Sequence, residues 1–119
     1  MINVPQQRIP RQLKEFAVPT QVNLSSSFDN RYTVVEIKTT DRPGILAQMG
    51  KAFIDCNIIV HNAKINTLGE QVDDIFFITN AEDTPLSELE QIEQLTQHLY
   101  MNIDSDRDTS QGATTAQSN

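Results

Sequence analysis

Hydrophobic and polar residues alternate along several stretches of the chain, a pattern typical of half-buried β-strands. The clearest stretch is residues 32–39, YTVVEIKT, where Val35 and Ile37 share one face and charged side chains lie on the other. Residues 18–25 follow a weaker alternation, and residues 72–79 carry apolar side chains on both faces. A strand with two apolar faces is typical of the centre of a sheet. A fourth strand is predicted over residues 58–68, before a tight turn at Gly69.

Two other segments repeat their apolar residues at the helical spacing of three and four. The first follows the sequence TDRPG, residues 40–44, and the second follows Thr84-Pro85. Thr40 or Asp41 is expected to cap the first helix. Gly50 lies inside it, where glycine costs about 1 kcal/mol relative to alanine, so a close approach of helix to sheet is expected there. The two apolar stripes comprise Ile45, Leu46, Met49, Phe53 and Cys56, and Leu86, Leu89, Ile92, Leu95, Leu99 and Ile103.

The predicted order is strand, strand, helix, strand, strand, helix. Two helices can cover only one face of a four-stranded sheet, so the fold class is α+β, a two-layer sandwich. A ferredoxin-like domain needs a strand after its second helix. A hairpin that places residues 18–25 beside residues 32–39 would fill that edge position. We therefore predict a permuted ferredoxin-like domain, ββαββα, with a four-stranded antiparallel sheet and both helices on one face.

The other face of this sheet has no predicted helix to cover it. Val34, Ile75 and Phe77 would project from it. An exposed apolar patch of this kind usually marks an interface, so a second copy of the domain or a sister domain is expected to pack there.

Composition limits the domain boundaries and the partners. Residues 104–119 contain no large apolar side chain, so they are predicted to form a disordered polar tail after a folded domain at 18–103, and residues 1–17 a lead-in. The formal net charge of −7 argues against a nucleic-acid partner. The absence of a long apolar run argues against a membrane span or a signal peptide, and we expect a cytoplasmic location.

The chain shows no constellation typical of an enzyme, and no catalytic residue or metal ligand is predicted. Cys56 and His61 could pair as nucleophile and base, but Cys56 falls on an apolar helical stripe, where a free cysteine is usually a buried hydrophobe. One loop stands out, residues 40–44, because a helix start offers unpaired N–H groups that suit a carboxylate. Asp41 could accept from an amine, so an α-amino acid would fit. Spacing alone favours the simpler interpretation, in which Asp41 caps the helix and Gly44 eases a turn.

Two segments, TTDRPGILAQMGKAF and HNAKINTLGEQVDDIFFI, resemble the ACT domain, a small-ligand sensing module. With the lead-in RIPRQLKEF and VPTQV, the chain resembles the C-terminal end of the bifunctional uridylyltransferase/uridylyl-removing enzymes of bacterial nitrogen control. The resemblance covers roughly residues 8–103. It implies a regulatory domain that senses glutamine and controls the two activities of its parent enzyme on the nitrogen-regulatory P-II protein. The parent's nucleotidyltransferase and hydrolase motifs do not occur in this chain, so no cofactor is expected in it, whereas the resemblance implies Mg²⁺ for the parent.

The resemblance also assigns a ligand site. Its loop comprises Asp41, Arg42, Pro43, Gly44, Ile45 and Leu46, and its facing strand positions comprise His61, Asn62 and Ala63. Such sites often form where two ACT domains pair, so binding as a dimer or with the sister domain is expected. Two alternatives remain open: a structural or dimerisation ACT domain without a ligand, and the ACT domain of an amino-acid biosynthetic enzyme.

Overall fold

The computed structural model of the chain describes the backbone of residues 19–116 and the side chains of residues 19–104. The predicted lead-in at residues 1–17 lies outside this range. Seven elements follow one another within it, and their order begins with two strands. They are β2 (Gln21–Ser26), β3 (Thr33–Thr40), α2 (Ile45–Asp55), β4 (Ile59–Lys64), β5 (Thr67–Leu68), β6 (Gln71–Thr79) and α3 (Leu89–Ala116).

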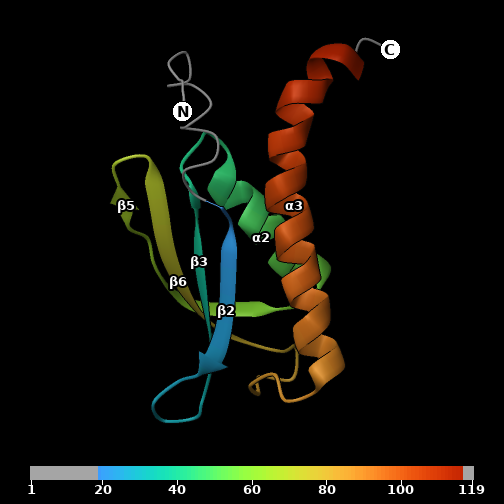
Figure 1. Cartoon of the computed structure of the whole chain (residues 1–119). Coiled ribbons are helices and arrows are strands. Elements are labelled where there is room, and N and C mark those ends of the chain that lie inside the picture. The colour runs from blue at the N-terminus through green and yellow to red at the C-terminus, as the bar shows by residue number, and fades with distance from the viewer. Residues whose placement is uncertain (1–18, 117–119) are drawn as a thin grey trace, which may run out of the picture.

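The strands form one antiparallel sheet in the order β2-β3-β6-β4, and the short β5 also pairs with β6. β2 lies at the edge beside β3, as the predicted hairpin requires, and β6 is central. Both helices lie on the same side of the sheet (Figure 1). The α+β class and the permuted ferredoxin-like order are therefore confirmed, with five strands in place of four.

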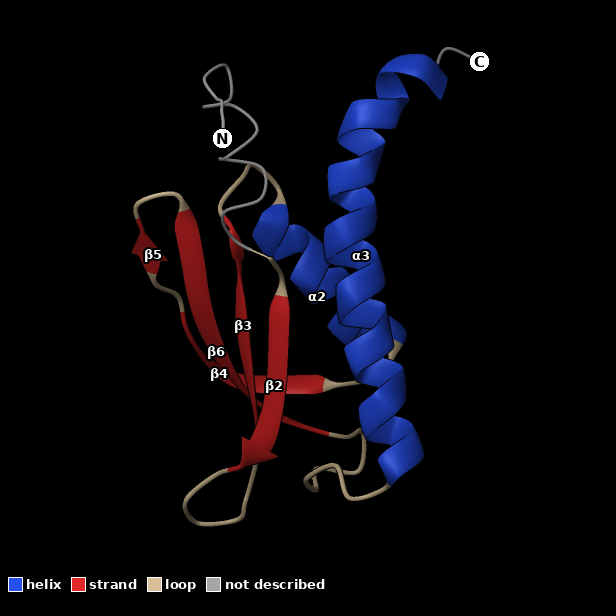
Figure 2. Cartoon of the chain, viewed as in Figure 1, coloured by secondary structure: helices blue, strands red, loops and turns tan. Residues whose placement is uncertain are grey.

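The core fills the space between the sheet and the helices, and we call the side of the sheet that lines it the helix face. Val35 and Ile37 of β3 and Phe76 of β6 are buried there, as the alternation predicts. Phe53 of α2 packs edge-on against Phe76, with ring centroids 5.0 Å apart. The opposite side, which we call the outer face, is not covered by any helix of the described residues (Figure 2).

The predicted strand at residues 58–68 divides into β4 and β5. Asn66 causes the break, because its backbone N–H donates to the carboxylate of Asp74 at 3.1 Å instead of extending the ladder. β4 also contains a bulge, since Val60 pairs with Ile78 whereas Asn62 already pairs with Phe77. A bulge shifts the alternation by one residue. Its consequence for the predicted site is described below.

The first helix differs from its prediction at three positions. α2 begins at Ile45 with Gly44 as its N-cap, and no side chain caps it, so the predicted cap by Thr40 or Asp41 is wrong. Leu46 is 47 % exposed and does not belong to the buried stripe, in which Ala52 is included instead. A Cβ atom built at Gly50 meets nothing within 4 Å, so the expected close approach of helix to sheet is absent.

The C-terminal end of α2 is closed by a residue type that suits its backbone conformation. Asn57 has a positive φ of 58°. The N–H of Ile58 donates to the carbonyl of Phe53 at 2.9 Å, and that of Asn57 to the carbonyl of Ile54 at 3.0 Å. These are the two hydrogen bonds of a Schellman cap, with asparagine in the position that glycine usually takes.

The second helix starts later and continues further than predicted. α3 begins at Leu89, which is 68 % exposed, whereas Leu86 is buried ahead of the helix. Leu95, Leu99 and Ile103 are fully buried, so the stripe itself is correct from the second helical turn onward. The helix continues to Ala116, past the point where a disordered tail is predicted. Once a helix is nucleated by packing, each added residue gains one hydrogen bond, so a polar segment can extend it.

Candidate functional site

The loop between β3 and α2 is held in place by its own backbone. The N–H of Asp41 donates to the carbonyl of Glu70 at 2.8 Å, which ties the loop to the turn before β6. The N–H of Ile45 donates to the carbonyl of Arg42 at 3.2 Å. Gly44 has φ 82° and ψ 0°, a left-handed conformation that L side chains rarely adopt. Glycine is therefore favoured at position 44, where the backbone takes this conformation immediately before the first residue of α2.

Arg42 connects this loop to the second helix. Its guanidinium donates to the carbonyl of Ile103 on α3 and, at 3.4 Å, to that of Thr40. Because Ile103 is fully buried, the contact joins the loop to the part of α3 that packs on the core. A displacement of the loop would therefore be transmitted to α3 through this hydrogen bond.

A buried carboxylate lies close to this loop. Asp74 of β6 is only 1 % exposed on the helix face. Burial raises the pKa of this carboxyl group, and the negative charges of Asp73 and Asp41 raise it further, while the hydrogen bond from Asn66 opposes the change. Negative potential at this end of the sheet suits a ligand that carries an ammonium group.

The structure divides the predicted ligand site between the two ends of the sheet. Residues 41–46 follow the end of β3, where Thr40 pairs with Gln71. Asn62 pairs with Phe77, six residues further along β6, which corresponds to about 20 Å at the usual rise of ~3.3 Å per residue. The loop and the β4 positions therefore do not meet within one chain.

Alternation along β4 places Asn62 and Ala63 on opposite faces, and the bulge brings His61 to the face of Asn62. Paired residues in an antiparallel sheet point to the same side. Ala63 pairs with Phe76 and so lies on the helix face, whereas Asn62, opposite Phe77, lies on the outer face together with His61. Ile45 is also unavailable to a ligand, because its side chain is buried in the core.

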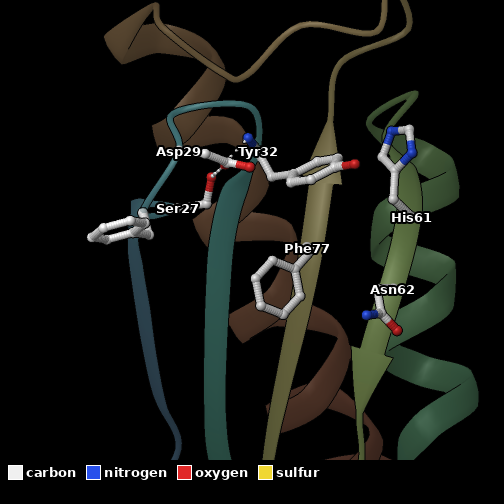
Figure 3. Close-up of a pocket in the computed structure, with 7 residues that line it drawn as sticks. Ser27, Asp29, Tyr32, His61, Asn62 and Phe77 are labelled. Atoms are coloured by element: carbon white, nitrogen blue, oxygen red, sulfur yellow. Dashed lines mark hydrogen bonds between the residues drawn. The ribbon is translucent and has the colours of Figure 1, made fainter.

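His61 and Asn62 instead line a hollow on the outer face, with a volume of about 420 Å³. Figure 3 shows the aromatic rings of Tyr32 and Phe77 between the β2–β3 turn and β4. The ring centroids of Tyr32 and His61 are 5.1 Å apart, and those of Tyr32 and Phe77 are 6.2 Å apart in an edge-on arrangement. The lining residues are Ser27, Phe28, Asp29, Tyr32, His61, Asn62 and Phe77.

The imidazole of His61 is fixed by polar partners on its far side. Its Nε2 lies 2.8 Å from the hydroxyl of Thr79 and 3.3 Å from the carboxylate of Asp83. Asp83 itself has a positive φ of 67°, which is uncommon for a residue other than glycine. These contacts hold the ring against Tyr32, so this wall of the hollow is formed before any ligand or partner arrives.

The β2–β3 turn forms the opposite wall. The carboxylate of Asp29 accepts hydrogen bonds from the hydroxyl of Ser27 at 2.8 Å and from the N–H of Arg31 at 3.1 Å, and both lower its pKa. The predicted hairpin implies only a connection between its two strands here, so the hollow is not predicted from the sequence. The signal that could have indicated it is Phe28, a large apolar residue in a polar turn.

Cys56 is partly buried against the core. Its Sγ is directed toward the carbonyl of Gln94 on α3 at 4.0 Å. Burial raises the pKa of the Cys56 thiol, and the negative charge of Asp55 raises it further. The reactive thiolate is therefore disfavoured. Within residues 19–104, no three His, Cys, Asp or Glu side chains are grouped so as to hold a metal ion.

Neither of the two described helices is long and apolar enough to cross a membrane. The architecture is that of a small α+β domain with the permuted ferredoxin-like order, compatible with an ACT domain. No protein-family model matches the chain.

Curated proteins similar to this chain share one description. The chain is 48 % identical over 87 residues to the bifunctional uridylyltransferase/uridylyl-removing enzyme of Stutzerimonas stutzeri (strain A1501), covering 73 % of the chain and 10 % of that enzyme. It is 43 % identical over 112 residues to the enzyme of the same description from Pseudomonas putida (strain F1), covering 94 % of the chain and 12 % of that enzyme. With the enzyme of Azotobacter vinelandii (strain DJ) the identity is 49 % over 85 residues, which covers 71 % of the chain and 10 % of that enzyme. The chain thus spans about a tenth of the length of the relatives that it matches.

Proposed function

We propose that this chain is the ligand-sensing regulatory part of a bifunctional uridylyltransferase/uridylyl-removing enzyme, and that its ligand is glutamine. The observation that carries the proposal is the identity of 43–49 % to a short segment of such enzymes. The ferredoxin-like architecture supports it. In this role the domain has no reaction of its own and sets the balance between the activities of its parent on the P-II protein.

The β3–α2 loop is the proposed contact with the amino-acid group of the ligand. The N–H of Ile45 donates to the carbonyl of Arg42. The other first-turn N–H groups of α2 have no partner within the helix and suit a carboxylate. Asp41, with Asp74 nearby, suits the ammonium group. The bond from Arg42 to the carbonyl of Ile103 supports a route by which occupancy of the loop biases α3. A ligand that prefers one arrangement of α3 would shift the parent between its activities.

His61 and Asn62 would complete this site only across two domains, because they lie at the other end of the sheet in one chain. Asn62 is exposed on the edge strand β4, so a neighbouring domain could bring its own loop to it. We therefore propose that full affinity requires a second ACT domain, either a sister domain or another copy.

The test is a calorimetric titration of the 119-residue chain with L-glutamine, with glutamate, phenylalanine and serine as comparison ligands. Saturable heat for glutamine alone supports the proposal. Equal heat for all four amino acids would leave the loop as a general amino-acid site and remove glutamine from the proposal. Silence from a folded chain would be followed by a titration of two linked domains, and silence there as well would exclude the sensing function.

The site is assigned by a pair of matched variants. Asp41→Asn removes the proposed ammonium partner and should weaken binding at least about tenfold, since a charge-assisted hydrogen bond contributes roughly 1.5–3 kcal/mol. Asp55→Asn removes the same charge at the other end of α2, where Asp55 pairs with Lys51 at 3.0 Å, and should leave binding unchanged. Equal effects of the two variants would show that only overall charge matters.

A second candidate function is an interaction domain without a ligand. The apolar outer face at Val34, Ile75 and Phe77 favours it, because these side chains are only half-buried. A chain that is silent toward amino acids but associates through this face would support this alternative.

A further inference from the structure

The hollow on the outer face is walled by aromatic rings that stand at steep angles to one another (Figure 3). The ring planes of Tyr32 and Phe77 meet at 85°, and those of Tyr32 and His61 meet at 49°. A flat ligand ring stacks most fully in a slot between two parallel rings, and neither pair forms such a slot. Rings at steep angles form a corner, which suits a rounded group that touches each π-face.

The turn between β2 and β3 adds a negative charge to the hollow. The carboxylate of Asp29 accepts hydrogen bonds from the hydroxyl of Ser27 and from the N–H of Arg31. Both donors bind Oδ1, so Oδ2 is the oxygen left for a positive charge. Of the seven described residues that line the hollow, none is a lysine or an arginine. The hollow therefore combines aromatic rings with a carboxylate, the two groups that attract a cation.

The chain itself places a cation beside one of these rings. The guanidinium carbon of Arg31 lies 5.7 Å from the centroid of the Tyr32 ring, within the range of a cation–π interaction. Arg31 lines a neighbouring hollow and is not among the residues that line this one. Within residues 19–104, no cation lies over the rings of Phe28 or Phe77. The π-faces of these two rings remain for a ligand.

Phe28 is the wall of the hollow that packing of the domain does not explain. Its side chain is fully exposed, with a relative exposure of 105 %. Exposure of an apolar ring to water is unfavourable in proportion to its area. An alkyl group in the hollow would cover part of this ring. The volume of about 420 Å³ falls in the range of small-ligand sites, roughly 300–1,000 Å³.

We propose that this hollow binds a small organic cation with an alkylated ammonium head group. Such a head group is rounded and spreads its positive charge over the alkyl groups, which contact the π-faces of Phe28 and Phe77. The carboxylate of Asp29 balances the charge. The formal net charge of −7 also favours the approach of cations. The hollow lies at the opposite end of the sheet from the β3–α2 loop, so this site is independent of the proposed amino-acid site.

The first test is a titration of the 119-residue chain with choline at constant ionic strength, followed by NMR of the histidine ring signals. The chain has two histidines, His61 at the hollow and His98 on α3, so the second is an internal control. Saturable shifts of the His61 signals alone are expected. The neutral probe 3,3-dimethylbutan-1-ol has the same shape with carbon in place of nitrogen, and should bind about tenfold more weakly. Equal binding of the two probes, or no saturable shift, would overturn the proposal.

A third probe distinguishes a free alkylated cation from the primary ammonium group of a lysine side chain. n-Butylammonium ends in the same group as lysine and is titrated in the same way. Tighter binding of choline supports the proposal, because its methyl groups contact more of the rings. Tighter binding of n-butylammonium would overturn it and indicate a lysine side chain of a protein partner as the occupant.

Two variants in the β2–β3 turn assign the site without a change in the core. Phe28→Leu keeps an apolar side chain but removes a π-face, and Asp29→Asn removes the charge. Each should weaken choline binding about threefold or more. Asp55→Asn is the matched control, since it removes the same charge from α2, where Asp55 pairs with Lys51, and it should leave choline binding unchanged. Choline binding that is indifferent to both turn variants, or that responds equally to Asp29→Asn and Asp55→Asn, would overturn the assignment.

Discussion

Asp74 is a carboxylate placed in the layer between the sheet and the helices, at a position that the alternation assigns to the core. Its neighbours on the same face of β6 are Val72, Phe76 and Ile78, all buried. The backbone N–H of Asn66 donates a hydrogen bond to the carboxylate of Asp74, which is why this polar side chain is tolerated in the core. The same hydrogen bond ends β4 and orients the start of β5. A residue that is unfavourable for the core thus determines where a strand breaks.

Asp74 makes the stability of the domain depend on pH. Its pKa is raised in the folded state, so its contribution to stability is greatest below the unfolded pKa and is lost as the pH rises through the folded value. Asp74→Asn keeps an acceptor for Asn66 and removes the buried charge. We expect the variant to gain about 1 kcal/mol over the parent chain at pH 7 and little at pH 3. Urea unfolding across that range is the measurement, and a constant difference would contradict the prediction.

The two glycines of the β3–α2 region differ in their backbone conformation, and their replacements should differ in sign. Gly50 has open space at its Cβ position, so Gly50→Ala should stabilise the domain by about 0.5–1 kcal/mol. Gly44 also has open space, but its φ of +82° should make Gly44→Ala destabilising by roughly 1–2 kcal/mol. Thermal unfolding of both variants measures the difference, and equal shifts would argue against the left-handed conformation at Gly44.

At the scale of elements, α3 is the helix that holds the layers together. The hydroxyl of Tyr100 accepts a hydrogen bond from the N–H of Val22 on β2 at 3.0 Å. The hydroxyl of Thr20 donates to Asp104 at 2.9 Å, beside the start of the same strand. These contacts attach α3 to the edge strand that completes the permuted sheet. Packing on α2 and on β2 is what aligns α3 with the sheet.

The corrected stripe of α3 can be tested with two leucines. Leu99 is fully buried, so Leu99→Ala should cost about 2–5 kcal/mol through lost contacts and a cavity. Leu89 belongs to the predicted stripe but is 68 % exposed, so Leu89→Ala should change stability by less than about 0.5 kcal/mol. Chemical denaturation of both variants distinguishes the observed helix from the predicted one, in which the two costs would be similar.

On the scale of the whole molecule, the sheet presents two separate features at its two ends. The β3–α2 loop lies where β6 begins, and the hollow around Tyr32 and His61 lies where β6 ends. The apolar outer face connects them. A domain with this arrangement presents a candidate ligand loop at one end of the sheet and an apolar surface on its outer face.

The buried core of the described residues ends at Ile103. We therefore expect that a chain ending at residue 106 keeps its fold and loses less than about 1 kcal/mol of stability, since only helix extension is removed. Helical circular dichroism should fall, while the unfolding transition stays cooperative. A loss of cooperative unfolding would show that the segment from 107 to 116 takes part in packing, and would move the predicted boundary at residue 103.

The sequence alone determined the order of the elements and most of the core. Apolar residues recur every two positions in a strand and every three to four in a helix, because the side chains on one face of each element must leave water. The pattern around Val35 and Ile37 therefore indicates a strand from the local sequence alone. The second helix was predicted from the same signal, and Leu95, Leu99 and Ile103 are buried accordingly. The permuted order followed from counting how many strands two helices can cover.

Only the tertiary structure decided the register of β4 and the composition of the sites. The bulge at His61 depends on pairing with β6, a partner more than ten residues away, and no local pattern encodes it. For this reason His61 lies on the face of Asn62 and not on that of Ala63. The pairing of β3 and β4 with β6 likewise divides the predicted site between two ends of the sheet. Side-chain exposure depends likewise on neighbours that are distant in sequence, which is why Leu46 and Leu89 fit a helical stripe and yet face the solvent.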